Sequence, residues 1–218
     1  METGLRRIKN KEMYAVRPNN LGWIEYRLDS QEMDYIWKCI ENKKRDWRST
    51  LAGHVSGSYE LIDRGDWFFN NTLLPLCDNY AKEFENLGLT VGITGTHPYH
   101  LKSMWVNYQK QNEFNPLHDH SGVYSFVIWM KIPFNWKVQN SNALAAAANN
   151  EKISTFQFQF LNILGRNLSW DYKLSTEDEG AMVFFPSGLH HQVYPFYNCD
   201  EERISVSGNI SINTTKRV

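Results

Sequence analysis

Residues 155–162 have the sequence TFQFQFLN, in which aromatic and amide side chains alternate. Successive side chains of a β-strand point to opposite faces, so the three phenylalanines share one face and the two glutamines share the other. A period of two over this length predicts a strand with one buried face.

Strand patterns of this kind fill the second half of the chain. Six further segments are rich in β-branched and aromatic residues and are bounded by Gly, Pro, Asn or Asp. They are residues 103–109, 123–132, 170–174, 181–185, 192–196 and 203–212.

The first 90 residues instead repeat apolar side chains at a spacing of three and four, which is typical of helices. One predicted helix begins after Asp29, which forms a capping-box motif with Glu32. A second runs from Phe69 to Leu87, with Gly88 as a stop signal. Each helix has one apolar stripe, which favours packing against a sheet.

Two helices followed by seven strands predict a mainly β fold of the α+β class. We expect a sandwich or jelly roll that helices buttress on one face. The length of 218 residues fits a single domain, 1–218, better than two small ones. Its helical, buttressing part is expected over about 1–90 and its strand-rich core over about 91–213.

Composition excludes several classes of protein. The formal net charge is -1, from 23 Lys and Arg against 24 Asp and Glu, so no strong field attracts nucleic acid or an anionic membrane. Cys39, Cys77 and Cys199 are too widely separated to suggest a disulfide framework or a cysteine metal cage. The longest apolar run falls far short of the roughly 20 residues of a membrane-spanning helix. We therefore expect a soluble protein of the cytoplasm.

Clustered histidines raise the hypothesis of a metal site. In an extended segment His118 and His120 point to the same side while Asp119 points away. Two imidazoles alone hold a first-row metal weakly, so a third ligand is needed, and His191 is the candidate. We expect a turn at residues 115–116, just before the first histidine. Such clusters also occur on solvated surfaces, and both interpretations remain open here.

Arg203 begins a strand in which polar residues share one face. Arg203 and Ser205 lie on this face, whereas Ile204 lies on the other. A guanidinium on the inner face of a barrel is costly unless it is paired, and a bound carboxylate matches its geometry. The alternative is that this face is solvated, as one face of an antiparallel sheet can be.

From about Met104 to Asn213 the chain resembles the iron(II)- and 2-oxoglutarate-dependent oxygenases of the prolyl-hydroxylase-like group. It is especially similar to a subgroup of small bacterial and phage proteins. The matching motifs are WVNY (105–108), NPLHDH (115–120), SGVY (121–124), FFPS (184–187), His191 and RIS (203–205).

The resemblance implies a double-stranded β-helix that binds iron(II), with 2-oxoglutarate and O₂ as cosubstrates. His118 and His191 match the two histidine ligands of the metal. Arg203 matches the residue that holds the distal carboxylate of 2-oxoglutarate. Further cofactor-binding candidates are Ser205, Tyr108, Asn107 and Tyr124.

One position departs from the family pattern. Most members have Asp or Glu two residues after the first histidine ligand, where this chain has His120. Either His120 is the third ligand, which makes the site one charge more positive, or the chain bends and Asp119 restores the usual triad. Both possibilities remain open.

The implied reaction is hydroxylation of a C–H bond in a peptidyl, for example prolyl, or small-molecule substrate, with decarboxylation of 2-oxoglutarate to succinate. A cupin-like three-histidine metalloenzyme without 2-oxoglutarate and a non-catalytic jelly-roll interaction module are the competing hypotheses. If the gene belongs to a phage, the expected location is the host cytoplasm. Residues 94–101 and 137–153 flank the histidine strand in sequence and are candidate lids, and the sequence leaves the oligomeric state undetermined.

Overall fold

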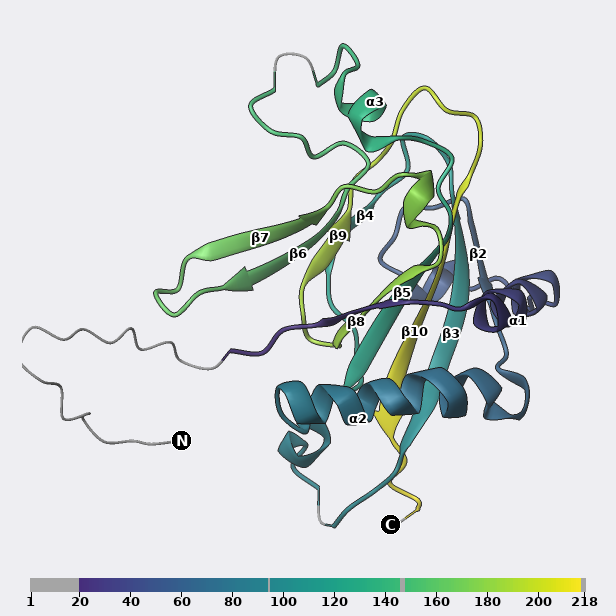
Figure 1. Ribbon diagram of the computed structural model, residues 1–218, viewed down its shortest axis with the longest axis vertical. Coiled ribbons are helices and arrows are strands. Elements are labelled where there is room, and N and C mark those ends of the chain that lie inside the picture. Colours follow the sequence, from purple (N-terminus) through teal and green to yellow (C-terminus); the bar gives the residue numbers. More distant parts are fainter. Residues whose placement is uncertain (1–19, 94, 146–147, 217–218) are drawn as a thin grey trace, which may run out of the picture.

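Two antiparallel sheets lie against each other, and helices pack on the outer face of the larger sheet (Figure 1). The computed structural model describes residues 20–93, 95–145 and 148–216. The helices are α1 (Ser30–Glu41), α2 (Leu74–Glu83) and α3 (Trp136–Asn140), with a π-helical turn at Phe69–Leu73 before α2. The strands are β1 (Ile24–Arg27), β2 (Gly57–Glu60), β3 (Tyr99–Gln109), β4 (Asn115–His118), β5 (Tyr124–Lys131), β6 (Phe156–Leu161), β7 (Asn167–Tyr172), β8 (Ala181–Pro186), β9 (His191–Val193) and β10 (Arg203–Ile212).

The larger sheet has the strand order β1-β8-β5-β10-β3-β2, and the smaller has the order β4-β9-β6-β7. Strand β10 therefore lies inside the larger sheet, with Ser205 paired to Asn107 of β3 and to Trp129 of β5. The predicted mainly β architecture with N-terminal helices is confirmed, and each of the seven predicted strands is present.

Three strands escaped prediction. β1 and β2 have four residues each, too few to show a clear period of two, and they join the same sheet as the later strands. The turn expected at residues 115–116 is wrong, because these residues begin β4. Proline is compatible with this strand since β4 is the edge of the smaller sheet, where a missing N–H breaks no ladder.

The N-terminus of α1 is fixed by the predicted capping box. Asp29 Oδ1 accepts a hydrogen bond from Glu32 N at 2.8 Å, and Glu32 Oε2 accepts one from Asp29 N at 2.9 Å. Glu32 is buried and also accepts hydrogen bonds from the hydroxyls of Tyr26 and Thr72. One carboxylate thus connects β1, α1 and the helical turn before α2.

The second helix ends earlier than predicted, at Glu83 rather than at Leu87. Phe84 has a non-helical backbone, with φ of -123° and ψ of -92°, and a separate short helical turn follows at Leu87–Thr90.

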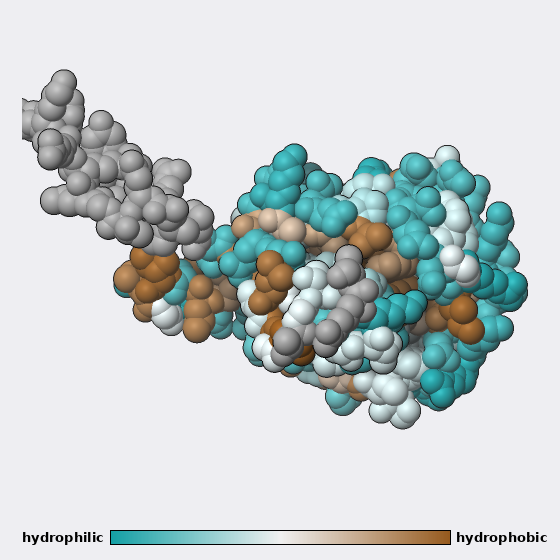
Figure 2. Space-filling model, turned by 90° about the horizontal axis from the view of Figure 1, so that it is seen from below, coloured by the Kyte–Doolittle hydropathy of each residue, from teal (hydrophilic) through white to brown (hydrophobic). Residues whose placement is uncertain are grey.

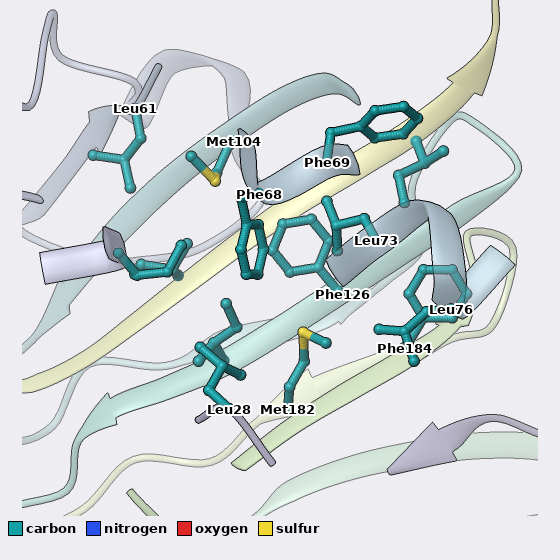
Figure 3. Close-up of a cluster of buried hydrophobic side chains, with 14 of the residues drawn as sticks. Leu28, Leu61, Phe68, Phe69, Leu73, Leu76, Met104, Phe126, Met182 and Phe184 are labelled. Carbon is teal, nitrogen blue, oxygen red and sulfur yellow. The ribbon is translucent and has the colours of Figure 1, made fainter. Parts of the chain in front are cut away.

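An apolar core fills the space between the helices and the larger sheet. Phe68 and Leu73 from the α2 region contact side chains of the sheet, among them Phe126, Met182 and Phe184 (Figure 3). A second core lies between the two sheets and includes Trp129, Phe156, Phe158, Val183 and Phe185. The larger sheet is therefore covered on both faces, and its inner face is the one that meets the smaller sheet.

The face of the molecule in Figure 2 is mostly hydrophilic, with apolar patches. The β6–β7 hairpin projects from the body, and Leu161, Ile163 and Leu164 are exposed near its tip (Figure 1). Within the described part of the chain, every helix is too short or too polar to cross a membrane.

Gly208 marks the closest approach inside the larger sheet. A Cβ atom at this position would lie 2.6 Å from the Phe126 ring and 2.7 Å from the carbonyl oxygen of Ser103. We expect Gly208→Ala to lower the free energy of unfolding by roughly 1–3 kcal/mol, the usual cost of overpacking a core. Urea denaturation measures this. Gly188→Ala is the matched control, because no heavy atom lies within 4 Å of its added Cβ. Equal denaturation midpoints for the two variants would contradict the packing argument.

Candidate functional site

Three histidines converge between the two sheets. His118 ends β4 and is paired in register with His191, the first residue of β9. His120 follows in the loop, where its backbone N–H donates to Ser187 O at 2.9 Å. The ring centroids are 4.2 Å apart for His118 and His191, 5.0 Å for His118 and His120, and 4.9 Å for His120 and His191. One nitrogen from each ring lies within 4.8 Å of the other two, which makes this cluster a candidate metal site.

Backbone carbonyls fix the tautomers of two of these rings. His118 Nδ1 lies 2.6 Å from Pro116 O, and His191 Nδ1 lies 2.9 Å from Leu189 O. A carbonyl oxygen only accepts, so in each ring Nδ1 carries the proton and Nε2 keeps its lone pair. Metal-binding histidines typically show this arrangement.

Burial keeps all three imidazoles neutral at neutral pH. Desolvation lowers the pKa of His118, lowers that of His120 to about 4, and places that of His191 well below its usual value. The neighbouring imidazoles add to this effect at His120 and His191. His191 is only 2% exposed and packs against the Phe156 and Phe185 rings. A neutral imidazole is the form that binds a metal.

Asp119 lies between the two histidines in sequence but does not belong to the histidine cluster. It is exposed, whereas His118 and His120 are partly buried, and it is not part of the three-residue cluster. Asp119 is one of the residues that line the cavity beside the cluster.

A cavity of about 220 Å³ extends from the histidines along the inner face of the larger sheet to Arg203. Its wall includes Asn107 and Gln109 from β3 and Arg203 and Ser205 from β10. These four side chains share one face because they alternate along two paired strands, in which Arg203 is opposite Gln109 and Ser205 opposite Asn107. Of the two interpretations left open for the polar face of β10, the inward one agrees with the structure.

Arg203 is buried without an acidic partner. It is 3% exposed, and among residues 20–93, 95–145 and 148–216 no carboxylate forms an ion pair with it. Its Nε and Nη2 donate to Gln109 Oε1 at 3.1 and 2.5 Å, and its Nη1 donates to Ser154 O at 3.0 Å. Burial lowers the pKa of Arg203 to about 9, so the guanidinium still carries its charge at neutral pH.

Two further polar groups in the cavity lack partners. Asn107 Oδ1 and Asn115 Oδ1 are both buried and have no hydrogen-bond donor among the described side chains and backbone. Buried polar atoms are normally satisfied, so these oxygens indicate a place for a ligand or for water.

Tyr108 and Tyr124 do not line this cavity, contrary to the expectation drawn from the resemblance. Both point to the helix-covered face of the larger sheet. Tyr108 packs edge-to-face on Tyr59 at 6.0 Å, and Tyr124 is buried against Tyr80 at 5.0 Å. Strand alternation explains this placement, since Tyr108 follows Asn107 and must face the opposite side.

The segment that closes the cavity was also missed. Residues 50–53 and 55 line it, and His54 holds this loop by stacking on Phe114 at 4.8 Å. No described residue of the candidate lids 94–101 and 137–153 lines the cavity. Proximity in sequence to the histidines was therefore a poor guide to proximity in space. Gln109 shares the alternation of Trp105 and Asn107 and could have been found from it.

The residues present fit a divalent metal ion and a carboxylate ligand. Three neutral imidazoles with available lone pairs suit iron, zinc, copper or nickel. A buried guanidinium without a counter-charge suits a carboxylate, which it can bind through two parallel hydrogen bonds.

Comparison with known proteins gives an independent result. Residues 103–209, just under half of the chain, match the family model described as "Putative 2OG-Fe(II) oxygenase". No curated protein matches the sequence significantly.

One solved structure shares the fold, and two others are less similar. A Pseudomonas putida prolyl-4-hydroxylase is 17% identical, with a TM-score of 0.51 over 88% of this chain and 94% of that one. An oxidoreductase of the 2OG-Fe(II) oxygenase family from Burkholderia pseudomallei is 14% identical, with a TM-score of 0.49 over 87% and 85% of the two chains. A viral collagen prolyl hydroxylase from Paramecium bursaria chlorella virus-1 is 11% identical, with a TM-score of 0.46 over 86% and 94%.

The matched segment contains all three clustered histidines and Arg203, and the larger sheet, the smaller sheet and the helices have the expected arrangement. Residues 103–209 of this chain are therefore similar in sequence to the 2-oxoglutarate- and iron(II)-dependent oxygenases, and the chain has the fold of a prolyl-4-hydroxylase.

Proposed function

We propose that the protein hydroxylates a C–H bond of a peptidyl or small-molecule substrate, using iron(II), O₂ and 2-oxoglutarate. In this proposal His118, His120 and His191 hold the metal, and Arg203 holds the distal carboxylate of 2-oxoglutarate. The observation that carries it is a cavity that has three neutral imidazoles at one end and, at the other, a guanidinium for which the described residues supply no counter-charge.

Charge supports the choice of His120 over Asp119 as the third ligand. Three neutral imidazoles leave the full positive charge of the metal, whereas a carboxylate ligand would offset part of it. A dianionic cosubstrate then meets positive charge at both of its ends, at the metal and at Arg203. The exposure of Asp119 is consistent with this assignment, because a metal-binding carboxylate would have to turn inward.

The bound metal and 2-oxoglutarate would supply the oxidising chemistry, in which one atom of O₂ enters the substrate hydroxyl and the other enters succinate, with release of CO₂. The protein would orient the reactants and exclude water. The guanidinium of Arg203 would bind the distal carboxylate of 2-oxoglutarate. The Ser205 hydroxyl lies beside Arg203 on the same face of the sheet. The backbone carbonyls of Pro116 and Leu189 fix the orientation of two imidazoles. Trp105, Trp129 and Phe156 form apolar walls that reduce access of water.

The experiment that tests the proposal is anaerobic reconstitution with iron(II), followed by addition of 2-oxoglutarate. We expect a visible charge-transfer absorption on addition of 2-oxoglutarate and formation of succinate once air is admitted. Absence of both, with iron shown to be bound, would contradict the proposed oxygenase activity.

The ligand set predicts different effects for two neighbouring substitutions. His120→Ala is expected to lower the iron content of the purified protein sharply, because it removes one of three ligands. Asp119→Ala is expected to leave the iron content unchanged, since Asp119 is exposed and outside the cluster. Metal analysis after dialysis measures both. Loss of iron in Asp119→Ala alone would show that the aspartate is the ligand.

A cupin-like enzyme that uses three histidines without 2-oxoglutarate is the second candidate function, and the observation that favours it is the cluster of three imidazoles. Arg203→Met distinguishes the two, because it removes the charge and retains most of the side-chain volume. For the oxygenase we expect 2-oxoglutarate binding to weaken by about 2–5 kcal/mol, the usual cost of removing one partner of a buried charge pair. Iron should remain bound. Calorimetric titration measures this, and an affinity for 2-oxoglutarate that does not depend on Arg203 would support the cupin-like enzyme.

A further inference from the structure

Gln109 accepts two of the three hydrogen bonds that the Arg203 side chain donates. We propose that Gln109 is a positioning residue, which holds the guanidinium with a neutral acceptor and thereby reserves its positive charge for a ligand carboxylate. This inference rests on the proposed function, because it concerns the same cavity and the same diacid.

The contacts of Gln109 lock both side chains in place. Gln109 is 6% exposed, and its Oε1 accepts from two nitrogens of Arg203. Its Nε2 donates to Glu113 O at 2.6 Å, which fixes the orientation of the amide. The acceptor is therefore the amide oxygen, and the pair forms directly across the β3–β10 register.

A count of donors shows what remains for a ligand. Arginine has five N–H groups. Gln109 takes the one on Nε and one on Nη2, and Ser154 O takes one on Nη1. One N–H is left on each terminal nitrogen. These two N–H groups are the donors that remain for a ligand carboxylate.

The local sequence offers a carboxylate that the structure keeps away from Arg203. Glu113 lies in the turn after β3, and its two carboxylate oxygens accept from the backbone N–H groups of Ser56 and Lys110, each at 2.9 Å. Gln109 contacts only its main-chain carbonyl. The Phe134 and Phe196 rings lie 5.8 Å from the guanidinium carbon and bring no negative charge.

The effect of the neutral acceptor follows from electrostatics. An amide oxygen accepts the hydrogen bonds of Arg203 and leaves its positive charge in place. A carboxylate at the same position would accept the hydrogen bonds and also cancel the charge. If a glutamate already neutralised Arg203, a ligand carboxylate would gain little electrostatic attraction from the guanidinium. That gain would not offset the cost of desolvating the ligand carboxylate. A glutamate at position 109 should therefore act as a built-in competitor of the ligand.

Gln109→Glu tests this, because glutamate keeps the acceptor and adds the charge. We expect the dissociation constant of 2-oxoglutarate, measured by calorimetry on the iron(II)-loaded protein under nitrogen, to rise at least about tenfold. Iron content should not change. If Gln109 only holds Arg203 in place, glutamate would serve equally well, and an unchanged dissociation constant would overturn the proposal.

The control variant is Gln139→Glu. Gln139 is 5% exposed, is hydrogen-bonded to the backbone of Tyr197 and does not line the cavity. We expect its dissociation constant for 2-oxoglutarate to stay within about twofold of the unmodified protein. A loss of affinity as large as that of Gln109→Glu would show that any buried glutamate has this effect, and would overturn the proposal.

Gln109→Met separates charge from orientation, because it supplies neither an acceptor nor a charge. We expect it to bind 2-oxoglutarate more weakly than the unmodified protein but more tightly than Gln109→Glu. Should Gln109→Glu not fold, an affinity of Gln109→Met as low as that of Arg203→Met would overturn the proposal. Failure of the unmodified, iron-loaded protein to bind 2-oxoglutarate would instead contradict the proposed function itself.

Discussion

The positive charge of Arg203, buried where no described carboxylate offsets it, is the constraint around which the cavity is organised. A buried charge is costly unless it is paired and hydrogen-bonded. The protein provides hydrogen bonds, from Gln109 and Ser154, but among the described residues it provides no counter-charge. Strand β10 can carry this charge because it is held on both sides by β3 and β5. The central position of the strand fixes the guanidinium at the end of the cavity opposite the histidines. An anionic ligand would supply the counter-charge that the described residues do not.

Much of the arrangement follows from alternation along strands and could be predicted from the sequence. The pattern of residues 155–162 and of β10 separates the side chains into two faces, although for β10 it leaves open whether the polar face is inward or solvated. The pairing of β3 with β10 then brings Asn107 and Ser205 onto the same inner wall. The prediction that Tyr108 lines the cavity came from the family resemblance and is wrong. Asn107 lines the cavity, so its neighbour Tyr108 lies on the opposite face of the strand. The contact of Ser154 O with Arg203 spans 49 positions of the sequence and has no local signature. The same holds for the loop of residues 50–55, which reaches the cavity only through tertiary packing.

The positions of the three imidazoles depend on both local and long-range contacts. His118 and His191 each donate Nδ1–H to the carbonyl oxygen two residues earlier, so the chain itself sets their tautomers. Only the pairing of β4 with β9 brings the two rings together. His120 lies beyond the end of β4, and its position depends on the backbone hydrogen bond to Ser187 and on the edge of the Trp105 ring at 5.7 Å. Contacts with residues distant in sequence thus position the third imidazole, whereas nearby backbone carbonyls orient the first two.

The two ends of the cavity have complementary consequences for the charge of a ligand. At one end, in the proposed ligand set, His120 occupies the position at which a carboxylate would reduce the charge of a bound divalent ion. Asp119 is exposed, so water and salt screen its charge. At the other end, Gln109 stands where a carboxylate would neutralise Arg203. In both places a neutral side chain fills the position at which an acidic one would compete with an anionic ligand. If a divalent ion is bound at the histidines, as proposed, a low dielectric strengthens both uncompensated charges, and each end then attracts a carboxylate more strongly than it would if the protein supplied its own. A ligand with a single carboxylate satisfies only one end, and a diacid of suitable length satisfies both.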